Sequence, residues 1–107
     1  MFRLIDINEC EVMWEPVYGV PVFHFNLKPN IKWSVSLKKK VLGGLYFVRK
    51  MFGEEGFSHI YAVCPYADDK LLKFSVLLGF EQWSYLNDED GNHLYTVCRQ
   101  PTIKGEA

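Results

Sequence analysis

One stretch, residues 58–80 (SHIYAVCPYADDKLLKFSVLLGF), constrains the fold of this chain more than any other. Its first residues, as far as Cys64, are largely apolar on both sides, as expected of a short strand that is covered on two faces. After Pro65 the apolar residues recur at spacings of four, three and four, which is the pattern of one helix face. These residues are Ala67, Leu71, Phe74 and Leu78. Gly79 then suits a left-handed helix end, so the stretch predicts a strand–helix unit of an α/β layer.

The flanking segments predict the rest of a mixed sheet. Alternating patterns indicate strands at residues 2–7, 11–18, 20–27, 57–64, 81–87 and 92–99, with a short strand at 31–35. Pro16 cannot donate to a sheet ladder, so we expect residues 11–18 to form an edge strand or to end there. Asp90-Gly91 predicts the turn of a final hairpin. The expected fold class is α/β (α+β), with a mixed, mostly antiparallel sheet of about five to six strands and two main helices.

A basic helix is predicted in the middle of the chain. Ser34 or Ser36 suits its N-cap, because a serine oxygen accepts hydrogen bonds from the first-turn N–H groups, and Gly53 suits its end. The pair Gly43-Gly44 costs on the order of 1 kcal/mol per glycine relative to alanine. We therefore expect another element to pack close there. The apolar face consists of Leu37, Val41, Leu45, Val48 and Phe52.

Length and composition limit the class of protein. The 107 residues suffice for one domain, predicted as residues 1–100, followed by a frayed tail at 101–107. No apolar run approaches the roughly 18 residues of a membrane span, and the N-terminus does not resemble a secretion signal. We expect a cytoplasmic protein without a membrane partner. Cys10, Cys64 and Cys98 form no CxxC pair and are interpreted as free, mostly buried thiols, with no metal site.

Basic residues are concentrated between residues 16 and 53. This segment contains no Asp or Glu and holds seven of the twelve Lys and Arg residues, although the net charge of the chain is −1. A one-sided basic surface attracts phosphate, nucleic acid or an acidic protein, but a basic run is also the ordinary solvated face of a helix. Lys38, Lys39 and Lys40 are the predicted partner-binding residues. The sequence pI of about 6.3 makes nucleic acid the less favoured partner.

The order of these elements resembles the C-terminal two thirds of the GNAT acetyltransferase fold, over roughly residues 18–97. The segment AVCPYADDKLLKFSVLLGFEQW is similar to the strand–loop–helix–LGF block of the family. The segment SVSLKKKVLGGLYFVRKMFGEEGFSHIYAV is similar to its cofactor helix and the strand that follows. YGVPVFHF, a W-x-x-S helix start and a basic helix are most similar to the short GNAT-like proteins of T7-type bacteriophages. The resemblance implies a shortened GNAT-like fold ending in a β-hairpin, in a protein of the host cytoplasm or the virion.

The residues that carry the chemistry of the family differ here. The family binds the acetyl-CoA pyrophosphate in a glycine-rich turn, but the matching residues 32–38 contain no glycine. The tyrosine acid of the family aligns with Ser75, whose hydroxyl is too weak an acid to protonate a leaving thiolate. The family's asparagine falls near Ala67 or Asp68, and only residues 8–10 replace its acceptor-wall helices. We therefore expect no catalytic residue and no cofactor. If acetyl-CoA does bind, the resemblance assigns it to Ser34, Val35, Ser36, Leu37, Lys38 and Lys39.

Three functions follow from these observations. The leading hypothesis is a small bacteriophage-type protein that has lost acetyl transfer and binds a virion or host protein. The alternatives are a minimal acetyl-CoA-dependent N-acetyltransferase acting on a protein or a small amine, and a nucleic-acid-binding domain using the Lys28–Lys50 face. An edge strand near residues 11–18 or the terminal hairpin would also allow a homodimer. His24, His59 and His93 are interpreted as structural or surface residues, and Asp68-Asp69 as a response to the helix dipole.

Overall fold

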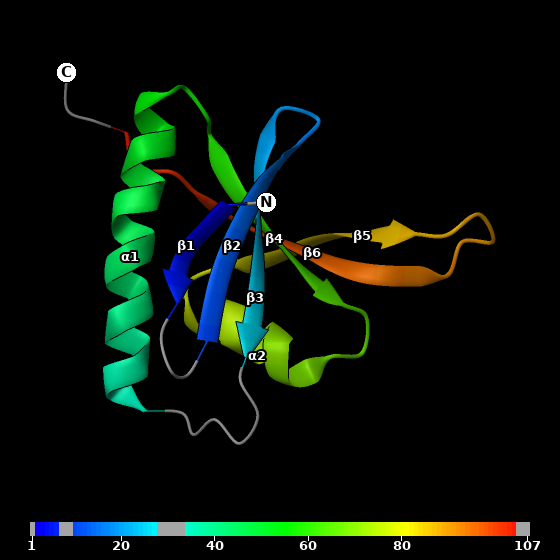
Figure 1. The fold of residues 1–107 in the computed structure, drawn as a ribbon. Coiled ribbons are helices and arrows are strands. Elements are labelled where there is room, and N and C mark those ends of the chain that lie inside the picture. The colour runs from blue at the N-terminus through cyan, green and yellow to red at the C-terminus, as the bar shows by residue number, and fades with distance from the viewer. Residues whose placement is uncertain (1, 7–9, 28–33, 105–107) are drawn as a thin grey trace.

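The computed structural model describes residues 2–6, 10–27 and 34–104, which form six strands and two helices (Figure 1). In chain order these are β1 (Phe2–Asp6), β2 (Cys10–Val17), β3 (Val20–Leu27), α1 (Val35–Glu54), β4 (His59–Pro65), α2 (Asp69–Leu77), β5 (Glu81–Asn87) and β6 (His93–Pro101). The described part of the chain therefore has the predicted alternation of strands and helices. The β5–β6 hairpin extends from the body on the side opposite α1 (Figure 1).

The strands form one mixed sheet in the order β1-β2-β3-β4-β6-β5. Every neighbouring pair is antiparallel except β3 and β4, which confirms the predicted mixed and mostly antiparallel sheet. The parallel pair is joined only at Val22–Tyr61 and Phe23–Ala62. Beyond these residues, toward their C-terminal ends, β3 and β4 are not paired with each other. This separation creates the opening on which the candidate site is built.

Strand β2 lies inside the sheet, so the prediction of an edge strand at residues 11–18 is wrong. Its last partner on β1 is Phe2, which faces Trp14, and Pro16 lies beyond it. On the other side Pro16 faces Pro21 across the hairpin. The proline is tolerated because β1 has already ended where its missing N–H would be needed. Of the predicted short strand at 31–35, residues 31–33 lie outside the described residues, and Ser34 and Val35 belong to the start of α1.

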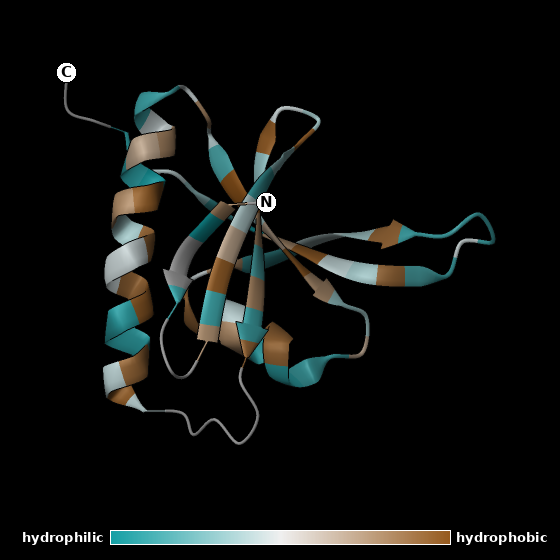
Figure 2. Cartoon of the chain, viewed as in Figure 1, coloured by the Kyte–Doolittle hydropathy of each residue, from teal (hydrophilic) through white to brown (hydrophobic). Residues whose placement is uncertain are grey.

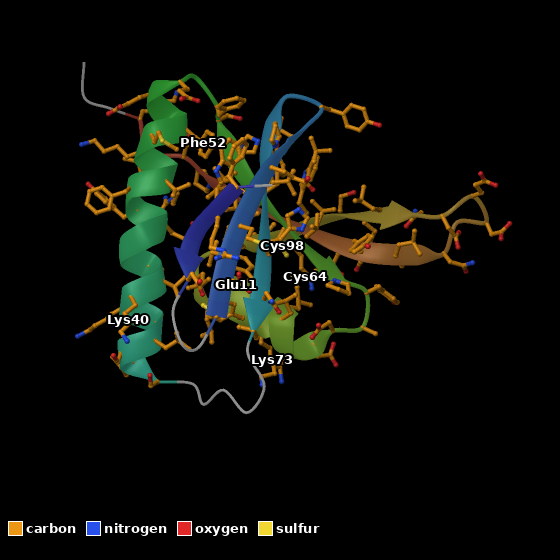
Figure 3. All side chains as sticks on the ribbon, in the orientation of Figure 1. Glu11, Lys40, Phe52, Cys64, Lys73 and Cys98 are labelled. Atoms are coloured by element: carbon orange, nitrogen blue, oxygen red, sulfur yellow. The ribbon has the colours of Figure 1, made fainter. Side chains whose placement is uncertain are left out.

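Both helices pack on one face of the sheet. The five residues of the predicted α1 stripe are all buried, which confirms the helix face read from the sequence. Phe52 of α1 contacts Trp14 and Phe23, with ring centroids 5.1 and 6.2 Å apart, and Figure 3 shows Phe52 between the helix and the sheet. Phe74 of α2 contacts Phe25 at 5.4 Å. Because Phe23 and Phe25 are alternate residues of β3, they point to the same side of the sheet, and one core serves both helices.

The helix ends follow local sequence signals. The Ser34 hydroxyl accepts from the Leu37 N–H at 3.0 Å, so Ser34 rather than Ser36 is the N-cap of α1. The Asp68 carboxylate caps α2 in the same way. Ala67 has a φ of 71° and precedes the helix, so its predicted place in the helical stripe is wrong. Gly79 has a φ of 98°, which confirms the left-handed helix end.

Close packing against α1 is seen at Gly53, whereas the first glycine of the predicted pair Gly43-Gly44 is open. A Cβ atom added at Gly43 would meet nothing within 4 Å, so the expectation of a close neighbour is wrong at this residue. At Gly53, by contrast, an added Cβ would overlap the carbonyl oxygen of Ile103. Residues 101–103, predicted to fray, are held there: the N–H groups of Thr102 and Ile103 donate to Ser58 and Arg49. No helix among the described residues is both long and apolar enough to cross a membrane.

Candidate functional site

The opening between β3 and β4 forms a cavity of about 500 Å³. Its walls come from the separated ends of the two strands, including His24 and Val63, and from Tyr95 on β6. The first turn of α2 lies at the same cavity through Asp68 and Lys70. The cavity exists because the parallel pairing stops at Phe23 and Ala62 while both strands continue.

A second cavity, a groove of about 610 Å³, lies on the sheet face that no described helix covers. Since Phe23 and Ala62 belong to the core face, their neighbours Val22 and Tyr61 point to this other side. We call this surface the open sheet face; its apolar residues include Val17, Val20, Val22, Tyr61, Val63, Trp83, Leu86, Tyr95 and Val97. Figure 2 shows hydrophobic residues along the hairpin that contributes to it.

His24 lies where the two cavities meet. His24, Val63 and Tyr95 line both cavities, so the opening between the strands adjoins the groove. His24 Nε2 lies 3.0 Å from Glu15 Oε1, in a partly buried position. An imidazole held by a carboxylate can accept a proton from an amine or bind a polar group. The sequence interpretation of His24 as a structural or surface residue is compatible with this pair, and its place beside both cavities is added by the structure.

Trp83 is the largest side chain at the groove, and two neighbouring side chains orient its ring. Its ring contacts Tyr61 at 5.5 Å, and the Arg99 guanidinium lies 4.8 Å from the ring centre. Even so, Trp83 remains 53% exposed. An aromatic ring that is oriented by its neighbours and open to solvent loses little rotamer freedom on binding, which suits it to anchor a partner.

Ser75, which aligns with the tyrosine acid of the resembled family, points into the core. It is fully buried, its hydroxyl donates to the Leu71 carbonyl at 3.2 Å, and its oxygen lies 3.3 Å from the Cys64 sulfur. A hydrogen bond from Cys98 lowers the pKa of Cys64 to about 7, and the same bond raises the pKa of Cys98. Figure 3 shows the two cysteines on β4 and β6. Ser75 lines neither cavity, and its hydroxyl contacts only the buried groups of Leu71 and Cys64 named above.

The predicted cofactor residues at the start of α1 are only partly brought together. Ser34, Val35 and Lys38 line a cavity of about 220 Å³ with Phe74 and Leu77 of α2 and with its C-cap residue Leu78. Ser36 and Lys39 are exposed but do not line it, and the Leu37 side chain is buried in the core. The N–H groups of Leu37 and Lys38 already donate to the hydroxyl and carbonyl of Ser34. Lys32 and Trp33 of the predicted turn lie outside the described residues.

The thiols and the basic residues are placed as the sequence indicates. Cys10, Cys64 and Cys98 are free and buried, which confirms that prediction. The described residues contain no group of three or more His, Cys, Asp and Glu residues that could hold a metal ion. Lys38, Lys39 and Lys40, predicted to bind a partner, are exposed in the first two turns of α1, and Figure 3 shows Lys40 near that end.

Comparison with known proteins identifies the fold. No protein-family model matches the chain, and no curated protein matches it. Solved structures do match. A GNAT-family acetyltransferase from Bacillus cereus superposes with a TM-score of 0.64 at 8% identity, covering 94% of this chain and 68% of that one. The ribosomal-protein-S18-alanine N-acetyltransferase from Escherichia coli gives 0.56 at 14% identity, with the same coverage of both chains.

A GNAT-family acetyltransferase from Bacillus anthracis also matches, with a TM-score of 0.58 at 13% identity, over 90% of this chain and 58% of that one. The shared feature is the fold, which is GNAT-like, as the sequence resemblance predicts. The present chain spans about two thirds of the length of the first two of these enzymes.

Proposed function

We propose that this protein is a GNAT-fold binding protein of bacteriophage type that has lost acetyl transfer and acts by binding a virion or host protein. The observation that carries the proposal is the environment of Ser75. The position that supplies the acid in the resembled family is fully buried here, and its hydroxyl is bonded to Leu71 and close to Cys64. It cannot deliver a proton into either cavity. The place of action is then the host cytoplasm or the virion.

The open sheet face supports a binding role. Clusters of exposed apolar residues rimmed by polar groups are typical of interaction sites rather than of plain solvated surface. Here the groove combines several aromatic residues with the Glu15–His24 pair at its edge. Energetically dominant interface positions are enriched in Trp and Tyr, and Trp83, Tyr61 and Tyr95 all line this groove.

Acetyl-CoA tests the proposal directly. A ligand present at about a hundred times its dissociation constant adds about 2.7 kcal/mol of stability, which would raise the melting temperature by about ten degrees. We expect no such rise at millimolar acetyl-CoA, and no acetyl transfer to a panel of peptides and small amines. The proposal fails if transfer is well above background and is abolished by Lys38→Glu, with Lys73→Glu on α2 as the matched control.

A second candidate, an acetyl-CoA-dependent N-acetyltransferase, is favoured by one specific observation. The cavity between β3 and β4 adjoins the open groove at His24, so a molecule held between the strands could meet an acceptor on the open face. His24, oriented by Glu15, would take the proton from the acceptor amine. In that case His24→Ala abolishes transfer and leaves any acetyl-CoA-induced rise in melting temperature unchanged. A variant that loses neither rules out this role of His24.

A further inference from the structure

The side of α1 that faces away from the sheet carries an unusual set of residues. At 3.6 residues per turn, Lys39, Gly43, Tyr46, Phe47 and Lys50 lie opposite the buried stripe of this helix. We call these five residues the outer stripe. Phe47 is 71% exposed and Tyr46 is 51% exposed. Their rings contact each other edge to face, with centroids 5.8 Å apart, and both keep half or more of their surface open to solvent.

The outer stripe is also basic and open. The acidic residue of the helix is its last one, the exposed Glu54, one turn beyond Lys50, and Lys39 and Lys50 stand at the two ends of the aromatic pair. Between them lies Gly43, where an added Cβ would meet nothing within 4 Å. A glycine in an exposed helix interior destabilises the helix, yet it also lets another backbone approach closely. No packing within the described residues uses that freedom.

We infer that the outer stripe docks an acidic amphipathic helix of a protein partner; this inference names the partner class of the proposed binding function. Lys39 and Lys50 are eleven residues apart, which is ~16 Å along the helix axis at 1.5 Å per residue. A partner helix with carboxylates three turns apart matches both lysines at once. Apolar residues between those carboxylates would cover Tyr46 and Phe47, and Gly43 would allow the helix axes to come within the usual ~8–10 Å.

The spacing of charge favours a protein over a nucleic acid. A duplex presents a phosphate every ~3.4 Å along each strand, and a protein gains affinity for it by neutralising several of these phosphates with Lys and Arg. The outer stripe has cations only at its two ends, with an aromatic pair and a glycine between them.

Synthetic helical peptides test the inference by the spacing of their charges. Three labelled peptides of identical composition carry two glutamates seven, eleven or fourteen residues apart, with leucines between them, and binding is followed by fluorescence anisotropy. We expect the eleven-residue spacing to bind most tightly and its affinity to fall with added salt. Lys50→Glu and Phe47→Ser should each weaken it by about tenfold, whereas Lys73→Glu and Val76→Ser, exposed residues of α2, should not.

Gly43→Leu separates docking from folding. Leucine is a good helix former and the space at this residue is open, so the variant should fold at least as stably as the parent. If the outer stripe docks a helix, the same variant binds the eleven-residue peptide more weakly, because the new side chain holds the backbones apart. If Gly43→Leu weakens peptide binding while it raises the stability of the protein, the glycine serves docking rather than folding.

Several results would overturn the inference. These are no binding of any peptide, equal binding at all three spacings, or equal losses in the α1 and α2 variants. Tighter, Lys50-dependent binding of a 20-nucleotide single strand or of phosphatidylglycerol vesicles would replace the protein partner by another class. An acetyl-transfer assay on the same samples distinguishes failure of this inference from failure of the proposed function. Acetyl transfer would refute the proposed loss of activity, whereas peptide binding tests only the outer stripe.

Discussion

Two glycines of α1 give the sharpest test of the structure, because the same substitution should have opposite effects at each. Gly43 and Gly53 both lie within Val35–Glu54, but only Gly53 has a neighbour that a Cβ would meet. Alanine at Gly43 removes the conformational cost of glycine in a helix interior without adding a clash. We expect it to stabilise the protein by about 0.5–1 kcal/mol and to raise the melting temperature by about 2–8 °C.

Alanine at Gly53 should be destabilising. Its Cβ would overlap the carbonyl of Ile103, and a backbone atom cannot swing aside as a side chain can. The segment after β6 would have to leave α1, breaking the bonds from the Ile103 N–H to Arg49 and from the Arg49 side chain to the Pro101 carbonyl. At about 1 kcal/mol for each hydrogen bond, less the gain in helix propensity, the net loss is about 1–2 kcal/mol.

Denaturant unfolding followed by tryptophan fluorescence measures both changes, provided that the slope of the transition stays constant. A chain shortened to residues 1–100 supplies the control, since it lacks Ile103. In the shortened chain both alanine substitutions should be neutral or stabilising. A double-mutant cycle that combines Gly53→Ala with the truncation should therefore give a coupling energy of roughly 1–2 kcal/mol or more. The reasoning is refuted if Gly53→Ala stabilises the full chain, or if its cost survives the truncation.

Three further predictions follow from local contacts. Ser34→Ala removes the cap of α1 and should cost about 1 kcal/mol of unfolding free energy, whereas Ser36→Ala should change little; equal losses would contradict the cap. Hydrogen bonds from Asn92 and Asp90 lower the pKa of Asp88, so its contribution to the hairpin turn is present at neutral pH and is lost as the pH falls through that lowered pKa. The Asn92 amide shift should titrate there, and a midpoint above the ordinary Asp value would refute it. Finally, the native protein should react slowly with a thiol reagent and the denatured protein should expose three thiols; rapid native labelling would show that Cys10, Cys64 or Cys98 is accessible.

Local signals predicted the elements of this fold well. The apolar stripe of α1, the left-handed Gly79 and the Asp90-Gly91 turn each depend on a few neighbouring residues, and the structure has all three. The same holds for the two helices and for the mixed sheet. Errors of one or two residues at helix ends, such as Ala67, arise because an aspartate can cap a helix as readily as occupy its first turn.

Long-range pairing was not predictable from the sequence. Whether β2 lies at an edge depends on whether β1 pairs with it. Pro16 suggests an edge strand, but it is tolerated because the pairing with β1 stops at Trp14, which the sequence near Pro16 does not indicate. The docking of Thr102 and Ile103 on the end of α1 has one trace in the sequence, Gly53. The sequence predicts this glycine as the helix end, but α1 continues to Glu54 and the left-handed glycine is Gly56. The meeting of two cavities at His24 required the separation of β3 from β4, which no spacing of residues encodes.

The two exposed apolar surfaces lie on opposite sides of the sheet. The groove lies on the face that lacks a described helix, and the outer stripe lies on the far side of α1, which packs on the other face. A partner on one surface therefore leaves the other accessible. Trp83→Ala should weaken only a ligand of the groove, and Lys50→Glu only a ligand of α1. If both surfaces bind proteins, the GNAT-like layer acts as a bridge between them, and the buried Ser75–Cys64 contact is part of the core that separates the two surfaces.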